Sequence, residues 1–253
     1  MNFKILVINL DRAAKRRQAA LKQLDHWCSH VERISAADAE ILSESVLHQH
    51  YSLTGNQKCY HKLLKNSEKG CYLSHIWCWQ KIVEEQLDFA IVLEDDFVLK
   101  GDLSLLLNDL RQLPRGWHYL KLAALKAGKT RSIITRRSLQ HFTLVDYSKN
   151  PILAMAQAVS YDGARLLLQK ALPFKRPIDV DLQYTWELGI KAQGLLPYCF
   201  EGNTAFSSQM KGRKQAQANF PLRLKLSASY WLRNTMHNMK TYGITTTMTA
   251  KRG

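Results

Sequence analysis

Residues 90–98, AIVLEDDFV, constrain the fold of this chain most strongly, because an apolar run ends there in three adjacent carboxylates. A run of alanine, isoleucine, valine and leucine is typical of a strand that is buried on both faces, as in a parallel sheet covered by helices. Such a strand carries the next residues to the carboxyl edge of the sheet, where open α/β folds bind their ligands. The sequence therefore predicts an α/β fold with Glu94, Asp95 and Asp96 at a binding edge.

The acidic cluster favours a divalent metal ion. Adjacent like charges repel one another and lose hydration unless a cation compensates them. Carboxylate oxygens suit Mn²⁺ or Mg²⁺, particularly where a substrate diphosphate completes the coordination sphere. Strand alternation puts Glu94 and Asp96 on one face and Asp95 on the other, so we expect Asp96 to be the main ligand, with Glu94 and Asp95 beside it. The alternatives are a solvated turn and, for Asp95, a capping role.

Strands and helices alternate over the first hundred residues. Apolar runs predict strands at 3–9 and 31–34, and apolar stripes predict helices at 13–26 and 71–86, whereas residues 39–66 have no clear pattern. Further along, we expect helices at 103–112 and 162–172 and strands near 117–123, 132–135 and 154–160. This order predicts a mostly parallel sheet layered with helices.

Cysteine usage and hydropathy favour a reducing compartment without a membrane span. The five cysteines form an odd set without a CxxC pair, which indicates free thiols. We expect Cys71 and Cys78 to be core residues of a helix. No window of about 18 apolar residues could cross a bilayer, and the N-terminal residues reach a charged pair too early for a signal peptide. We therefore expect a cytoplasmic protein.

Positive charge is concentrated toward the C-terminus. The formal net charge is +15, and residues 211–253 hold nine lysines and arginines but no acid. Aromatic and aliphatic residues lie between them, a mixture that could lie on an anionic membrane surface. The alternative is an ordinary helix that packs on a domain formed by residues 1–210. A second acid-free basic stretch, 111–137, could frame a phosphorylated acceptor.

Five further blocks accompany the acidic strand end. They are VINLDRAAKRR (7–17), RISAAD (33–38), GCYLSH (70–75), AVSYDGA (158–164) and PIDVD (177–181). In this order and at these distances, the blocks resemble glycosyltransferase family 25, which contains bacterial lipooligosaccharide galactosyltransferases and collagen galactosyltransferase domains. The resemblance spans about residues 3–182. It implies the Rossmann-like, nucleotide-sugar-binding architecture called GT-A, here followed by a basic, mainly helical C-terminal extension at 211–253.

This resemblance implies that the N-terminal blocks bind a UDP-sugar. Basic residues just after the first strand can make charge-assisted hydrogen bonds to a diphosphate, and polar residues there can bond uracil or ribose. We expect nucleotide-sugar contacts from Asn9, Asp11, Arg12, Arg16, Arg33, Asp38, Ser74 and His75. The alternatives are a helix cap at Asp11, an ion pair between Arg33 and Asp38, and a structural hydrogen bond from His75.

The last block supplies carboxylates for catalysis. Transfer with inversion needs a general base that accepts the proton of the attacking acceptor hydroxyl. We expect Asp179 to be this base, with Asp181 as a second catalytic candidate and Glu187 as a weaker rival. The alternative is that Asp179 and Asp181 cap a helix over residues 182–192.

Together these features predict an inverting, metal-dependent glycosyltransferase. The resemblance implies UDP-galactose as donor, a β-linked product, and a lipooligosaccharide or lipopolysaccharide core as acceptor at the cytosolic face of the inner membrane. The alternatives are another UDP-sugar, such as a glucose or N-acetylhexosamine donor, and a catalytically silent binding protein on the same scaffold. No recognisable nucleic-acid-binding pattern accompanies the charge, so we expect no nucleic acid partner.

Overall fold

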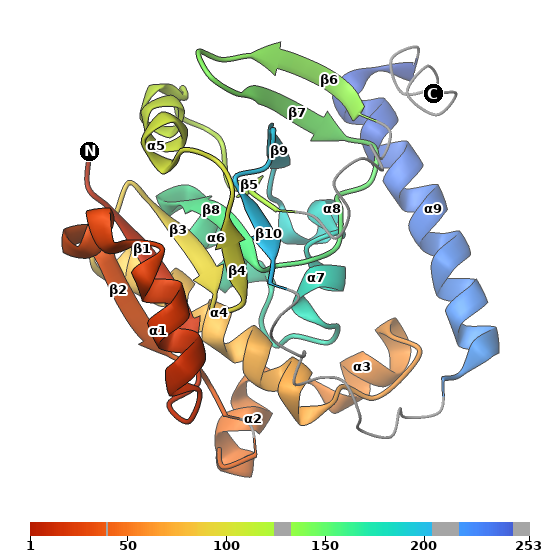
Figure 1. Ribbon diagram of the computed structural model, residues 1–253. Coiled ribbons are helices and arrows are strands. Elements are labelled where there is room, and N and C mark those ends of the chain that lie inside the picture. Colours follow the sequence, from red (N-terminus) through yellow and green to blue (C-terminus); the bar gives the residue numbers. More distant parts are fainter. Residues whose placement is uncertain (39, 124–132, 204–217, 245–253) are drawn as a thin grey trace.

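A central eight-stranded sheet organises the chain in the computed structural model, which describes residues 1–38, 40–123, 133–203 and 218–244 (Figure 1). Its strand order is β2-β1-β3-β8-β5-β9-β7-β6, and β10 pairs with β4 in a small second sheet. The strands are β1 (Phe3–Asn9), β2 (Val31–Ser35), β3 (Phe89–Glu94), β4 (Phe97–Leu99), β5 (Tyr119–Lys121), β6 (Ile133–Ser138), β7 (Thr143–Tyr147), β8 (Ala156–Ser160), β9 (Ala192–Leu196) and β10 (Phe200–Gly202).

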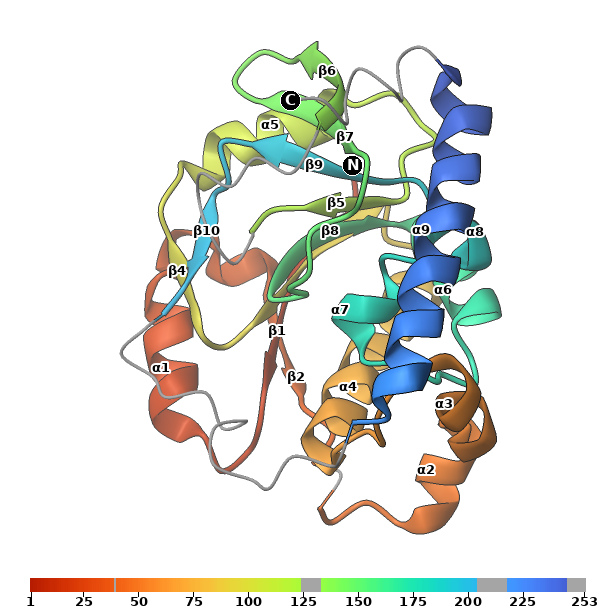
Figure 2. The same cartoon turned by 90° about the vertical axis from the view of Figure 1, so that its right-hand side faces the viewer.

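Helices cover both faces of this sheet (Figure 2). They are α1 (Ala14–Lys22), α2 (Glu44–His50), α3 (Leu53–Cys59), α4 (Asn66–Glu84), α5 (Leu103–Gln112), α6 (Tyr161–Lys170), α7 (Ile178–Asp181), α8 (Thr185–Leu188) and α9 (Phe220–Tyr242), with a 3₁₀ helix, η1 (Asp25–His30), after α1. Strand β1 pairs in parallel with β2 and β3, and only β8 and β7 run against the other described strands of the large sheet. The predicted α/β class and mostly parallel sheet are confirmed.

The apolar run before the three acids is the central strand β3, as its composition predicts. Phe89, Ile91 and Leu93 belong to the core cluster beneath α1 and α5. The alternating residues Ala90 and Val92 belong to the opposite cluster, beneath α4 and α6. Burial on both faces therefore fixes the register of β3 and delivers Glu94 to the carboxyl edge of the sheet.

Several predicted elements have different bounds or are replaced. The helix predicted at 71–86 begins earlier, at Asn66, where the Glu68 carboxylate accepts a hydrogen bond from the Lys65 backbone N–H at 2.8 Å. The unassigned stretch 39–66 contains α2 and α3. A helix over 182–192 was a wrong alternative, because α8 ends at Leu188 and β9 begins at Ala192. The hairpin of β6 and β7 replaces the single strand predicted at 132–135.

The AVSYDGA block joins β8 to α6 by a close approach of two backbones. The Ser160 hydroxyl accepts a hydrogen bond from the Gly163 N–H at 3.1 Å and so caps α6. A Cβ atom at Gly163 would lie 2.0 Å from the carbonyl oxygen of His118. Glycine is therefore required there by packing, and this block has a structural role.

The predicted C-terminal helix is α9, which lies along the flank of the domain (Figure 1). The side-chain amides of Asn234 and Asn238 both donate to the Ser148 carbonyl oxygen, at 2.6 and 2.8 Å, and the Tyr242 hydroxyl donates to Asp146 at 3.1 Å. One face of the helix therefore packs on the domain, as the alternative interpretation of the tail predicts. The domain boundary predicted between 210 and 211 lies outside the described residues. Within the described ranges, no helix is long and apolar enough to cross a membrane.

Candidate active site

A cleft of 180 Å³ opens at the carboxyl ends of β1 and β3. It lies between the start of α1, the loop after β2 and the first turns of α4. Nine of the predicted site residues line it: Asn9, Arg12, Arg16, Asp38, Ser74, His75, Glu94, Asp95 and Asp96. These residues come from four blocks that are distant in sequence, and the parallel pairing of neighbouring strands brings their ends together.

Asp95 joins β3 to the elements on one side of the cleft. Its carboxylate accepts a hydrogen bond from the Asn9 side-chain amide at 2.6 Å and forms an ion pair with Arg16. The residue is 8% exposed. Because both contacts are made inside the protein, Asp95 fits the alternative role of holding neighbouring backbone and side chains in place, and we retain Glu94 and Asp96 as the metal candidates.

Asp96 is the least compensated of the three acids. Its carboxylate lies 3.2 Å from Arg16, a cation that it shares with Asp95. Burial raises the pKa of Asp96 to about 6, the charge of Glu94 contributes to this rise, and Arg16 offsets only part of the effect. A carboxylate that is hard to ionise beside a second carboxylate is an arrangement that a divalent cation would stabilise.

Glu94 is oriented by α4 on the opposite side of the cleft. Its Oε1 lies 3.2 Å from His75 Nε2 and accepts from the Cys71 thiol at 3.5 Å. His75 is fully buried, and its Nδ1 lies 2.7 Å from the amide nitrogen of Gln157 on β8. Burial alone would raise the pKa of Glu94, but the contacts with His75, Cys71 and Arg16 lower it on balance. The chain Gln157–His75–Glu94 therefore presents a fixed, ionised carboxylate to the cleft.

Cys71 packs against the core cluster that contains Cys78, as expected, but it also reaches the cleft. Its side chain faces Glu94 and lines the cleft, whereas Cys78 is buried in the core as predicted. The Cys71 thiol, the His75 ring and the Glu94 carboxylate could share one metal ion, since their ligand atoms lie within 4.8 Å of one another. Burial and the charge of Glu94 raise the pKa of Cys71, so the thiol stays protonated and acts as a donor. Mn²⁺ and Mg²⁺ prefer oxygen ligands, so the carboxylates of the cleft fit these ions better than the thiol does.

The ion pairs around the nucleotide blocks differ from the Arg33–Asp38 pair that was the alternative to nucleotide contacts. Asp38 forms an ion pair with Arg12, and Arg33 forms one with Asp11. Asp11 is not a helix cap either, because α1 begins at Ala14 and has no side-chain cap. Asp11 and Arg33 do not line the cleft, and Arg33 instead donates to the backbone oxygen of Asn9 at 3.2 Å. Their position indicates that Asp11 and Arg33 hold Asn9 in place from outside the cleft.

Ser74 links α4 to the loop after β2. Its hydroxyl donates to the Gly70 carbonyl oxygen at 2.8 Å and accepts from the Ala37 N–H at 2.9 Å. These contacts hold the chain next to Asp38 in place. Ser74 therefore shapes the cleft mainly through the backbone that it supports.

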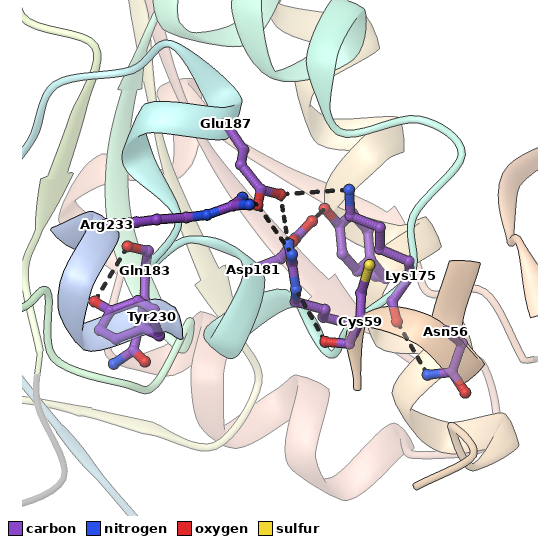
Figure 3. A network of polar contacts seen from close by, with 10 residues as sticks. Asn56, Cys59, Lys175, Asp181, Gln183, Glu187, Tyr230 and Arg233 are labelled. Carbon is purple, nitrogen blue, oxygen red and sulfur yellow. Dashed lines mark hydrogen bonds and ion pairs between the residues drawn. The ribbon is translucent and has the colours of Figure 1, made fainter. Parts of the chain in front are cut away.

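Asp181 belongs to a buried ion-pair network (Figure 3). Its two carboxylate oxygens accept hydrogen bonds from Arg176 and from the Tyr72 hydroxyl, each at 2.7 Å. The residue is only 3% exposed. Glu187, the weaker rival base, is held by the same arginine at 2.9 Å and by Lys175 at 3.3 Å. Because both of its oxygens are engaged inside the protein, this geometry favours a structural role for Asp181 over the predicted catalytic one.

Asp179 is placed differently, although it lies on the same short helix. It is half-buried and makes no ion pair with another described residue. Burial raises its pKa, and the positive charge of Lys121 lowers it in part. The charge of Asp179 in turn raises the pKa of Cys71, which indicates that it lies near the cleft. A carboxylate with a raised pKa and no ion-pair partner among the described residues has the properties of a general base.

Lys121 is a residue that sequence reasoning missed. It lies in β5, is 1% exposed, and donates from Nζ to the Leu153 carbonyl oxygen. A lysine within the apolar run YLKLAAL was the available signal, since a buried lysine requires partners. Its positive charge makes the Asp179 carboxylate easier to ionise.

Removing the Asp96 charge is expected to stabilise the metal-free fold at neutral pH. The pKa of Asp96 is raised from 3.8 to about 6, so the stability that its protonated form contributes at low pH is lost as the pH rises through about 6. In Asp96→Asn that loss disappears, and the free energy of unfolding at pH 7 should rise by about 1–3 kcal/mol. Urea denaturation in the presence of a chelator measures this change.

The exposed residue Glu84, at the end of α4, provides the control for this measurement. Glu84→Gln removes the same charge at a position outside the cleft, and it should change stability little. The gain from Asp96→Asn should shrink as the pH falls through about 6 and vanish below about pH 4, where the wild-type carboxyl is protonated in both the folded and the unfolded state. A loss of stability at pH 7 would show that Asp96 is instead a structural ion-pair partner.

Comparison with known proteins identifies relatives over most of the domain. A family model described as "Glycosyltransferase family 25 (LPS biosynthesis protein)" matches residues 2–179. A glycosyltransferase 25 family member from Aedes aegypti is 28% identical over 186 residues, which are 70% of this chain and 29% of the relative. Procollagen galactosyltransferase 2 from Mus musculus is 26% identical over 185 residues, which are 70% of this chain and 29% of the relative. The inactive glycosyltransferase 25 family member 3 from Mus musculus is 29% identical over 187 residues, which are 70% of this chain and 30% of the relative.

The chain thus spans about 30% of the length of these curated relatives. Solved structures are more distant. A Drosophila galactosyltransferase 7 mutant in complex with manganese, UDP-Gal and xylobiose has a TM-score of 0.42 and 8% identity, covering 87% of this chain and 83% of the other. A mannose-1-phosphate geranyltransferase from Thermus thermophilus has a TM-score of 0.43 and 10% identity, covering 79% and 75%. At such low scores, the fold class rests on the sheet of the chain itself.

Proposed function

Because the chain belongs to glycosyltransferase family 25, we propose that it transfers a hexose from a UDP-sugar to a glycan acceptor. The observation that carries this proposal is the cleft at the ends of β1 and β3, where Glu94 and Asp96 share one edge with the basic start of α1. Donor binding would use charges that are already present there. The raised pKa of Asp96 supports the same proposal, because it indicates negative charge that the neighbouring cations do not fully compensate.

Glu94 and Asp96 would hold a divalent ion, Mn²⁺ or Mg²⁺, which would act as a Lewis acid on the donor diphosphate. The residues of the chain supply the rest. Arg12 and Arg16 would contribute charge-assisted hydrogen bonds to the diphosphate after exchanging contacts with Asp38 and Asp96. Asn9 is held between Asp95 and the Ala13 carbonyl oxygen, so its position at the end of β1 is set before substrate arrives.

Asp179 is our proposed general base. In a single displacement, it would take the proton of the acceptor hydroxyl as that oxygen attacks the anomeric carbon, while the nucleoside diphosphate leaves from the opposite face. The product would have the inverted, β configuration if the donor is α-linked. Because the pKa of Asp179 is raised, its conjugate acid is weaker and its carboxylate is a stronger proton acceptor.

For the donor and acceptor, we propose UDP-galactose and the core of a lipooligosaccharide or lipopolysaccharide. Procollagen galactosyltransferase relatives support galactose, and the family description, which names LPS biosynthesis, supports the acceptor. A silent binding protein is the second candidate, because three relatives carry the word inactive in their names. The raised pKa values of Asp179 and Asp96 favour the enzyme, since a binding protein has no need of carboxylates that are costly to ionise.

A donor-hydrolysis screen tests this function. UDP-galactose, UDP-glucose and UDP-N-acetylhexosamines are incubated with the full chain, with and without Mn²⁺, and released UDP is measured. We expect Mn²⁺-dependent release that is fastest with UDP-galactose. Release that is fastest with another sugar would change the donor assignment, and no release together with tight UDP binding would favour the binding protein.

We also propose that residues 211–253 extend a catalytic domain of residues 1–210 and hold it peripherally at the cytosolic face of an anionic membrane. The sequence of α9 contains four basic residues and no acid. The apolar side chains of Phe220, Leu224 and Trp231 on α9 are 61%, 57% and 61% exposed. Apolar side chains next to basic ones are the composition of a helix that lies in a lipid interface.

At low ionic strength, the chain should therefore co-sediment with phosphatidylglycerol vesicles but not with phosphatidylcholine vesicles, and salt should release it. Each engaged basic residue contributes about 1 kcal/mol. The double variant Leu224→Ser, Trp231→Ser keeps every charge but should bind more weakly, because it loses apolar insertion. Leu105→Ser, at an exposed leucine of α5, is the matched control. Equal binding to both kinds of vesicle, or to neither, would contradict the proposal.

A further inference from the structure

A second pocket, of 220 Å³, lies between α7, the residues after α3 and the inner face of α9. We call it the basic aromatic pocket, because its walls include Tyr60, His61, Lys149, Tyr184, Arg223 and Tyr230. In the described part of the chain, no acidic residue lines it. The combination of three tyrosine rings with cationic side chains is unusual for a packing defect and is typical of a ligand site.

The rings of this pocket are held in place before any ligand binds. The Arg176 guanidinium lies 3.6 Å from the centroid of the Tyr184 ring, and Tyr184 packs edge-on against Tyr230 at 5.0 Å. Lys149 Nζ lies 4.7 Å from the centroid of the Tyr230 ring. Because these aromatic faces are fixed, a flat, partly apolar ligand such as a sugar ring could pack on them at little entropic cost.

Positive charge is available at the mouth of the pocket. The Arg223 side chain is exposed and makes no ion pair with another described residue. The pKa of His61 is lowered by burial and by the charges of Lys62 and Arg223, as expected where positive potential is concentrated. An anionic group would find uncompensated charge there.

Asp179 connects this pocket to the cleft. Its neighbour Val180 lines the basic aromatic pocket, and the charge of Asp179 acts both on Tyr60 in that pocket and on Cys71 in the cleft. Asp179 itself lines neither cavity, but through Val180 it adjoins the basic aromatic pocket, so a molecule seated on the tyrosines would lie near the carboxylate that we assign as general base.

We propose that the basic aromatic pocket binds the acceptor, and that the acceptor is an anionic saccharide that carries a phosphate or carboxylate group near the sugar to be extended. The proposal rests on the proposed transferase function. Its sugar ring would pack on the tyrosines, its anionic group would meet Arg223, and its hydroxyl would face Asp179. Since α9 supplies one wall, the helix would link the acceptor pocket to the surface that we propose lies on the membrane.

Ligand-observed NMR on the full chain with UDP and Mn²⁺ tests this inference. The probes are glucose 6-phosphate, glucuronic acid, glucose and inorganic phosphate. Both anionic sugars should bind more tightly than glucose and than inorganic phosphate, and the stronger of the two identifies the anionic group. Arg223→Glu should lower the affinity for the anionic sugars by at least about tenfold, because one charge-assisted hydrogen bond is lost. The affinity for glucose should not change.

Lys225→Glu is the matched control, because Lys225 lies on the same helix, is exposed and does not line the pocket. It should bind all four probes as the wild type does. Equal weakening by Lys225→Glu, equal affinity of glucose and glucose 6-phosphate, or equal affinity of inorganic phosphate and the sugar phosphate would each overturn the proposal. Calorimetric titration with UDP keeps the two proposals apart: retained UDP binding with failed probe binding rejects only the acceptor pocket, whereas absent UDP binding rejects the transferase function itself.

Discussion

Asp96→Ala is expected to abolish sugar transfer, with a loss of about 10³-fold or more in kcat/KM, because a Lewis-acid metal contributes several kcal/mol to such a reaction. Asp96 lies at the edge of the sheet, where its carboxylate shares the Arg16 cation with Asp95. Metal-dependent binding of UDP should be lost together with turnover. Product formation and calorimetric titration of UDP, each with and without Mn²⁺, measure the two effects.

The fold of this variant should remain intact, because the lost side chain lies outside both core clusters. Asp95→Asn is an informative companion: it disturbs the contacts with Asn9 and Arg16, so it should reduce activity but keep the metal dependence. Glu84→Gln should behave as the wild type. Normal activity of Asp96→Ala, or full wild-type activity in excess chelator, would remove the metal from the mechanism.

The central part of the fold could be predicted because its residues allow few alternatives. The run from Phe89 to Leu93 is apolar at every position, and such a run can be buried only between two helical layers. The edges were less predictable. Strand β6 is largely exposed and contains two arginines, so no burial pattern marks it, and its pairing with β7 is visible only in three dimensions.

The composition of the cleft was predictable for a topological reason. Asn9 and Glu94 end parallel neighbours, so the residues that follow β1 and β3 must lie at one edge of the sheet. Ion-pair partners were not predictable. Two basic and two acidic residues can pair in more than one way, and the sequence does not reveal that Arg33 points to Asp11 on the outside while Arg12 meets Asp38 at the cleft.

Residues that support the cleft from distant parts of the sequence were not predicted. Gln157 contacts His75 from β8, which pairs with β3 although it follows that strand by more than sixty residues. Asp181 has contacts that the sequence did not indicate. Its spacing from Asp179 resembles a catalytic pair, but one turn of helix directs Asp181 toward Arg176 and Tyr72 in the interior. Spacing alone does not distinguish an acid that faces substrate from one that neutralises a buried arginine.

Asp179→Asn is expected to lower kcat by about 10² or more and to leave the affinity for UDP-sugar nearly unchanged, which is the usual effect of removing a general base. The amide keeps the size of the side chain but cannot accept the proton. Because burial raises the pKa of Asp179, wild-type kcat should fall as the pH decreases through that raised pKa, and this acidic limb should be absent from the variant. Steady-state kinetics between about pH 4 and 8 measure both features.

Asp181→Asn is the matched control for this prediction, since it makes the same chemical change two residues away on α7. It leaves the buried Arg176 without one of its two carboxylate partners, so the free energy of unfolding should fall by about 2–4 kcal/mol. Its kcat per folded molecule should change much less than that of Asp179→Asn. If Asp179→Asn instead loses stability, or weakens UDP-sugar binding without lowering kcat, Asp179 has a structural or binding role and a different group must take the proton of the acceptor.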